Sequence, residues 1–268
     1  MPTESRLSRI FASRRVLVAY LCVGDPSLDE SLELARACVR AGADVLELGV
    51  PFSDPAADGP VIARAGARAL ARGGGLSATL RVASALRTES DVPLVLFGYY
   101  NPIYVRGEAR AVDEAADAGI DAFLVVDLPL EEAGPLRRLA ANRGLTVVPL
   151  LAPTSSPQRI EAVRLAHAEV PMDFVYYVSV TGITGAAGVQ AADAGTRART
   201  LREALGLPVV VGFGIDSQEK ARAAGQQADG VVVGTALVRA IEEGQSAADR
   251  VERVSSLIAL LRQGLDGT

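Results

Sequence analysis

Three carboxylates at the end of one apolar stretch are the side chains best placed to do chemistry in this sequence. Residues 47–60 read ELGVPFSDPAADGP, so Glu47 lies within the apolar run 45–50, and Asp54 and Asp58 follow in a loop rich in proline and glycine. Burial of a carboxyl group in an apolar strand is costly, and it raises the pKa toward values that suit proton transfer at neutral pH. Asp58, eleven residues further on, can face the same pocket. The other interpretation is a hydrogen-bonded buried glutamate followed by two aspartates that only form turns.

The scarcest residue types exclude several kinds of chemistry. The 268 residues include one histidine, His167, and one lysine, Lys220, and both lie in runs with helical spacing. A zinc or iron site needs more than one histidine or a cysteine cluster. A Schiff-base lysine should lie in an apolar strand that faces a pocket. We therefore expect no metal and no cofactor, and lysine aldolases, pyridoxal enzymes and histidine–metal hydrolases are disfavoured.

Composition limits the partners and the compartment. The net charge is -5 with no basic block, which argues against nucleic acid, and no run of eighteen apolar residues could cross a membrane. Two cysteines without metal-site spacing, and no secretory segment, indicate a reduced cytoplasmic protein. In the arginine-rich segment 5–15, Leu7, Ile10 and Phe11 recur at helical spacing, which predicts a short amphipathic lid helix in preference to a transit peptide.

Short apolar runs alternate with helical segments along the whole chain. We expect strands at 16–21, 45–49, 93–97, 121–126, 146–150, 174–179, 208–212 and 230–233. Helices are expected between them, for example at 27–42 and 131–144, with stops at Gly42, Gly119, Gly144 and Gly206. The segment 60–90 should hold two helices broken at residues 73–75. Eight such units predict a (β/α)8 TIM barrel, a single domain over residues 1–268. An extra N-terminal helix and an extra short helix before the last helix complete it.

Two glycine loops point to a phosphate. GFGID follows the seventh strand and places Gly212 and Gly214 where a backbone can approach an anion closely. VVVGTAL follows the eighth strand and places Gly234 and Thr235 at the start of a helix, where free N–H groups attract anions. These two loops form the recurrent phosphate site of such barrels. The alternative is that the glycines only permit tight turns.

The segment 181–195, TGITGAAGVQAADAG, follows the sixth strand and lacks apolar periodicity. It is longer than the roughly 2–6 residues usual for a connection between a strand and a helix. We interpret it as a mobile lid over the site. An ordinary surface loop is the alternative.

Seven motifs together resemble the tryptophan synthase alpha subunit family over nearly the whole chain. They are YLCVGDP (20–26), ELGVPFSDPAADGP (47–60), GYYNPI (98–103), VVDLPLEE (125–132), YYVSVTGITG (176–185), GFGI (212–215) and VVVGTALVRAI (231–241). The resemblance implies cleavage of indole-3-glycerol phosphate to indole and glyceraldehyde 3-phosphate in tryptophan biosynthesis. It also implies a pyridoxal-dependent beta subunit as partner, in an alpha2beta2 heterotetramer.

The resemblance assigns roles to individual residues. It makes Glu47 the general acid/base and Asp58 the carboxylate that binds the indole N–H. The phosphate would lie on backbone groups at Gly185, Gly214, Ile215, Gly234 and Thr235. The indole pocket would be lined by Tyr20, Phe97, Leu124 and Tyr176. Asp54 and Thr184 fall where two loops meet on closure. Val180 stands where many members have an arginine, which puts an ion pair from that position in doubt.

Other functions remain open at this point. A phosphosugar isomerase or indole-glycerol-phosphate synthase could use the same fold, but the latter depends on a strand-end lysine that this sequence lacks. A non-catalytic activating subunit is a further alternative, against which the presence of both Glu47 and Asp58 argues. The sequence does not separate a free-standing lyase from one that works in a complex.

Overall fold

The strands form one parallel sheet that closes on itself. The computed structural model describes residues 5–178, 191–212 and 214–267. Neighbouring strands follow the order β5-β4-β3-β2-β1-β9-β8-β7-β6. Their bounds are β1 Val16–Cys22, β2 Val45–Gly49, β3 Leu94–Gly98, β4 Ala122–Val125, β5 Thr146–Val147, β6 Leu150–Leu151, β7 Val175–Val178, β8 Val209–Gly212 and β9 Gly230–Val233. The expected alternation of apolar runs thus corresponds to strands within one or two residues of the expected ranges.

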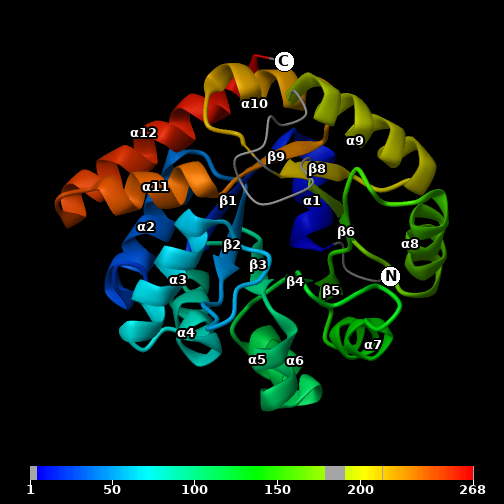
Figure 1. The fold of residues 1–268 in the computed structure, drawn as a ribbon, viewed down its shortest axis with the longest axis horizontal. Coiled ribbons are helices and arrows are strands. Elements are labelled where there is room, and N and C mark those ends of the chain that lie inside the picture. The colour runs from blue at the N-terminus through cyan, green and yellow to red at the C-terminus, as the bar shows by residue number, and fades with distance from the viewer. Residues whose placement is uncertain (1–4, 179–190, 213, 268) are drawn as a thin grey trace.

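The expected strand 146–150 is present as two short pieces, β5 and β6. Pro149 interrupts it because proline has no backbone N–H to donate. The N–H of Val148 donates to the carbonyl of Phe123 in β4 at 2.8 Å, and the carbonyl of Pro149 accepts from the N–H of Tyr176 in β7 at 3.0 Å. The segment therefore bridges the two ends of the strand order, and the (β/α)8 barrel prediction is confirmed (Figure 1).

Helices surround the strands, as Figure 1 shows in a view down the barrel. Their bounds are α1 Arg6–Ser13, α2 Leu28–Ala41, α3 Pro60–Ala71, α4 Leu76–Arg87, α5 Tyr100–Arg106, α6 Glu108–Asp117, α7 Gly134–Asn142, α8 Pro157–Glu169, α9 Ala191–Leu205, α10 Gln218–Gly225, α11 Thr235–Glu243 and α12 Ala247–Asp266. The expected pair of helices in 60–90 corresponds to α3 and α4. The extra N-terminal helix is α1, and the extra short helix before the last one is α11.

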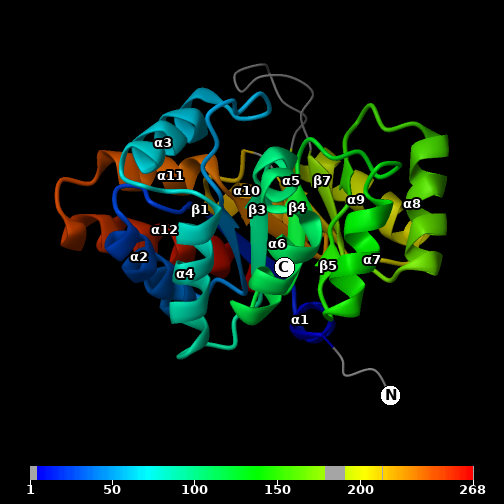
Figure 2. The ribbon, with the colours of Figure 1, turned by 90° about the horizontal axis from the view of Figure 1, so that it is seen from below.

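The helix α1 covers the end of the barrel where the strands begin (Figure 2). Leu7 is fully buried, and Ile10 and Phe11 pack against the barrel interior. The rings of Phe11 and Phe174 have centroids 5.1 Å apart. The amphipathic helix expected from residues 5–15 is confirmed, and it closes the amino-terminal end of the barrel.

At this same end, aspartates at equivalent positions just before several strands bind the neighbouring strand. Asp44, Asp121 and Asp229 stand just before β2, β4 and β9, and each accepts a bond from a backbone N–H in the neighbouring strand, at Leu17, Leu94 and Val209 (2.8, 2.8 and 2.9 Å). An arginine also donates to each carboxylate, from Arg262, Arg87 and Arg202 respectively. Asp173, before β7, accepts instead from the hydroxyl of Thr146 at 2.8 Å. Strands are thereby joined in pairs at their starts.

We expect Asp121→Ala to lower the free energy of unfolding by about 3 kcal/mol, because it leaves the Leu94 N–H without its acceptor and removes the carboxylate that balances the charge of the partly buried Arg87. Urea unfolding measures this. Asp113→Ala is the control, since Asp113 is about half exposed and meets only a surface arginine, Arg143. Equal effects of the two substitutions would show that the aspartate repeat carries no special share of the stability.

Candidate active site

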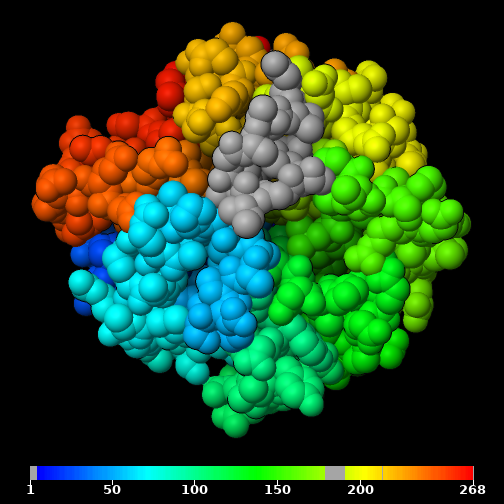
Figure 3. Space-filling view, viewed as in Figure 1, coloured from blue at the N-terminus to red at the C-terminus, as the bar shows by residue number. Residues whose placement is uncertain are grey.

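A cavity of about 610 Å³ opens at the carboxyl ends of the strands. Side chains from β1, β2, β3 and β7 line it, together with the loop after β2 and the start of α11. In the space-filling view, the segment after β2, in blue, lies near the centre of this face (Figure 3). This is the end of a parallel barrel at which binding sites are usually found.

Most residues singled out from the sequence meet at this cavity. Those that line it are Tyr20, Glu47, Asp58, Phe97, Tyr176, Gly214, Ile215, Gly234 and Thr235. Leu124 does not line it and is fully buried in the barrel interior. Asp54 is exposed on the loop after β2 and does not line it either. Gly185, Thr184 and Val180, with most of the expected lid, lie outside the described residues.

Glu47 is the most deeply buried carboxyl group of the cavity. It lies in the middle of β2, beside Tyr20 of β1 and Val95 of β3, and only 1 % of it is exposed. Within the described residues, no hydrogen-bond donor reaches its buried Oε1 atom. Burial raises the pKa of Glu47 to about 8. The side chain is therefore a neutral acid at pH 7, able to donate a proton and take it back.

Asp58 is held by a residue for which the sequence had suggested no role, Tyr99. Burial raises the pKa of Asp58 to about 6, and the hydrogen bond from Tyr99 partly opposes that rise. The Tyr99 hydroxyl also accepts from the N–H of Ala57 at 3.0 Å, and its ring stacks on Phe52 with centroids 5.2 Å apart. Tyr99 thus holds Asp58 and the part of the loop that precedes it. The sequence signal was the aromatic pair that directly follows the third strand, in GYYNPI.

Aromatic rings form the apolar walls around the carboxyl groups. Tyr20 meets Phe97 edge to face, with ring centroids 5.1 Å apart. A Cβ atom on Gly49 would lie 2.5 Å from the Tyr20 hydroxyl, and one on Gly212 would lie 2.0 Å from the Tyr176 hydroxyl. Both rings therefore occupy space that only glycine leaves free. The register also turns Tyr176 toward the cavity, whereas its neighbour Tyr177 packs into a separate buried cluster.

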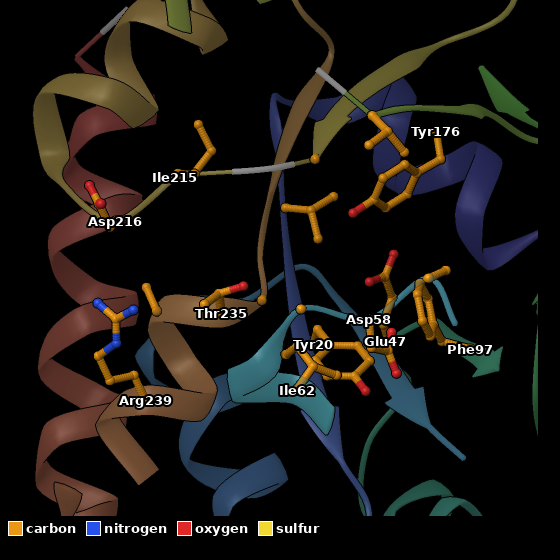
Figure 4. A pocket seen from close by; sticks show the side chains of 18 of the residues that line it. Tyr20, Glu47, Asp58, Ile62, Phe97, Tyr176, Ile215, Asp216, Thr235 and Arg239 are labelled. Carbon is orange, nitrogen blue, oxygen red and sulfur yellow. The ribbon is translucent and has the colours of Figure 1, made fainter. Parts of the chain in front are cut away.

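The opposite end of the cavity offers backbone groups to an anion. Gly214 has a φ of +70°, a conformation that favours glycine. Gly234 caps α11, whose first turn has no acidic residue and whose cap residue makes no side-chain hydrogen bond, so the first N–H groups of the helix can bind an anion. Figure 4 shows Ile215, Thr235 and Arg239 at this end and Glu47, Asp58, Phe97 and Tyr176 at the other. The cavity can thus hold a molecule with an apolar ring at one end and an anion at the other.

Neither the lone histidine nor the lone lysine lines the cavity. His167, on α8, accepts a bond at Nδ1 from the N–H of Met172 at 3.0 Å, and burial lowers its pKa. Lys220, on α10, pairs with Asp216 at 2.8 Å on the surface. Both have the structural roles expected from their helical sequence context.

Three comparisons with known proteins, by family model, by sequence and by structure, all point to one family. The family model described as tryptophan synthase alpha chain matches residues 9–265. The tryptophan synthase alpha chain of Geobacter sp. (strain M21) is 47 % identical over 97 % of this chain and 98 % of its own length. The crystal structure of tryptophan synthase subunit alpha from Legionella pneumophila str. Paris superposes with a TM-score of 0.90 at 32 % identity, covering 99 % of this chain and 100 % of the other. A structure of the tryptophan synthase alpha2beta2 complex of Pyrococcus furiosus matches with a TM-score of 0.80 at 32 % identity, covering 95 % and 99 %. With this sequence match along nearly all of its length, the chain belongs to the tryptophan synthase alpha chain family.

Proposed function

We propose that this chain is a lyase that cleaves indole-3-glycerol phosphate to indole and glyceraldehyde 3-phosphate in tryptophan biosynthesis. Membership of the tryptophan synthase alpha chain family supports this activity. The observation that carries the proposal is Glu47, a fully buried acid that is neutral at pH 7 and shares one cavity with Asp58.

The reaction is a retro-aldol cleavage, which needs a proton at indole C3. Glu47 donates that proton, so C3 becomes tetrahedral and positive charge develops on N1. Asp58, as a carboxylate, accepts a hydrogen bond from N1–H and stabilises that charge in the apolar cavity. Glu47 then takes the proton of the adjacent side-chain hydroxyl. The oxygen forms the aldehyde carbonyl as the C3–carbon bond breaks, and the bonding electrons return to the ring to give indole. Each proton-transfer role contributes roughly 10²–10⁴-fold to the rate.

The phosphate of the substrate would bind at the glycine end of the cavity. The groups proposed for it are the backbone N–H groups of Gly214, Ile215, Gly234 and Thr235, with Gly185 as the fifth. Since α11 begins at Thr235, the positive end of its dipole faces this place. The aromatic walls of Tyr20, Phe97 and Tyr176 would hold the indole ring beside the two carboxyl groups.

The partner we propose is a tryptophan synthase beta subunit, in an alpha2beta2 heterotetramer like the one named for the Pyrococcus furiosus protein. The loop after β2 carries both Asp54, which is exposed, and Asp58. A partner that moves this loop would move a catalytic group. We also retain the proposal that Asp54 and Thr184 meet when the loops close. A cytoplasmic location agrees with a biosynthetic enzyme, and no helix among the described residues is long and apolar enough to cross a membrane.

Glu47→Gln should lower the rate of indole release about 10³-fold while affinity for the substrate changes less than about tenfold, because only the proton shuttle is lost. Asp58→Asn should lose most activity too, since an amide cannot balance positive charge on N1. The assay is indole release by the purified chain, with and without a beta subunit. Glu161→Gln, a surface change on α8, controls for altered net charge. Activity above one tenth of wild type in Glu47→Gln would remove Glu47 from this role.

The pH dependence of the stability of the protein should show directly that Glu47 is buried as a neutral acid. The folded-state pKa of Glu47, about 8, is above its ordinary value of 4.5, so its contribution to stability is fully present below about pH 4.5 and is lost as the pH rises through 8. Glu47→Gln does not titrate. Between pH 5 and pH 8 the free energy of unfolding of this variant should therefore rise by about 3 kcal/mol relative to wild type. Urea unfolding at both pH values measures it, and parallel pH profiles would contradict burial of a neutral acid.

Phosphate binding should depend on the backbone more than on the nearby cation. Gly234→Val should weaken binding of glycerol 3-phosphate at least about tenfold by blocking close approach to the start of α11. The substitution suits this test because Gly234 has a negative φ and a Cβ there meets only the Tyr20 Cβ, at 3.8 Å. Arg239→Ala, on the same helix, should weaken binding less. A larger loss from Arg239→Ala, measured by calorimetry, would mean that side-chain charge builds the site.

A further inference from the structure

Four charged side chains join the two helices that begin at opposite ends of the cavity. Arg68 of α3 donates through Nε and Nη2 to the two carboxylate oxygens of Asp25, both at 2.8 Å. Its Nη1 donates to Oε1 of Glu242 on α11 at 2.7 Å. Arg64, one turn earlier on α3, donates two further hydrogen bonds to Glu242, of 2.9 and 2.8 Å. We call these four residues the brace.

The brace connects the elements that carry the two ends of the site. The helix α3 begins at Pro60, two residues after Asp58, and α11 begins at Thr235, in the proposed phosphate site. Figures 1 and 2 both show α3 beside α11. Asp25 follows β1, the strand of Tyr20. Arg68 lies about 12 Å along α3 from Pro60, at 1.5 Å per residue, and Glu242 is the second-last residue of α11, so their contact joins the two helices away from the ends that reach the cavity.

The geometry of the contacts is rigid. Asp25 is almost completely buried, with 3 % of its side chain exposed. Because two bonds join Asp25 to Arg68, the planes of the carboxylate and the guanidinium are held in one orientation. The helix also packs tightly there, since a Cβ atom on Gly24 would lie 3.0 Å from the Cβ of Ala69. The two arginines keep the pKa of Glu242 low, at about 2, so the carboxylate is charged at neutral pH.

We propose that the brace sets the spacing between the carboxyl end and the phosphate end of the cavity, and so determines how well one molecule fills both. This inference rests on the proposed function, in which a single substrate carries an indole ring and a phosphate at a fixed separation. Binding of the second group is then intramolecular, and its gain depends on how well the two ends are aligned. Without the brace, each end should still bind its own fragment.

The test compares one linked ligand with its two fragments in the full-length chain. Indolepropanol phosphate, the substrate without its two hydroxyls, spans both ends, whereas indole and glycerol 3-phosphate each occupy one. In Glu242→Ala, affinity for the linked ligand should fall about tenfold while affinity for each fragment changes less than about twofold. The KM for indole-3-glycerol phosphate should rise by about the same factor by which affinity for the linked ligand falls.

Glu114→Ala is the matched control. Glu114 is as exposed as Glu242 (28 against 26 %), and it likewise accepts two bonds from one arginine, Arg106, and one from another, Arg110. It lies on α6, outside the cavity lining. This variant should keep the wild-type gain from linking, which separates alignment from a general loss of an ion-pair cluster.

The outcomes distinguish the two proposals. If the wild-type chain binds the linked ligand no more tightly than the fragments, the proposed function and the brace both fail. If wild type shows the gain and Glu242→Ala keeps it, or loses affinity for all three ligands equally, only the brace is overturned. A selective loss for the linked ligand in Glu242→Ala, absent in Glu114→Ala, supports it.

Discussion

The chemistry of this protein depends on the burial of one carboxyl group in an apolar barrel. Glu47 lies in a strand whose five residues are all buried, between two further strands of the sheet. In water the group would be ionised at pH 7 and a poor proton donor. The barrel removes the water, and the described residues supply no cation in exchange, so the neutral form is favoured. Every element that closes the barrel around β2 therefore helps to raise the pKa of a single side chain and to keep it protonated.

At the other end of the barrel, a buried carboxyl group has hydrogen-bond donors and arginines as partners. Asp121 is also largely buried, but it accepts a backbone N–H and faces two arginines, Arg87 and Arg6. Its charge is matched by donors in fixed positions, and it joins strands and the N-terminal helix. The Oε1 atom of Glu47 has no such donor among the described residues. Satisfied carboxylates where the strands begin, and an unsatisfied one near where they end, divide the barrel into a structural end and a reactive end.

Much of this could be predicted from the sequence because it follows from local pattern. The apolar runs gave the strands, the glycines after Ala41 and Leu205 marked helix ends, and Glu47 stood out as a charge within an apolar run. The prediction of one continuous fifth strand was wrong, because Pro149, which has no N–H to donate, divides it into β5 and β6. Tyr99 was missed because its importance lies in contacts with Ala57 and Asp58, forty residues away. A contact between distant segments leaves no periodic signal.

The brace shows the same limit most clearly. Arg64 and Arg68 are spaced one turn apart on an amphipathic helix, which in a sequence is typical of a solvated surface. Only the fold brings Asp25 and Glu242 to them, from positions 43 and 174 residues away from Arg68. Nearly all positive charge in the chain is arginine, whose planar guanidinium can hold two carboxylates at once in a defined geometry, as a lysine ammonium cannot. The preference for arginine thus fits a protein in which ion pairs join helices in a defined geometry, while the buried Oε1 atom of Glu47 has no donor among the described residues.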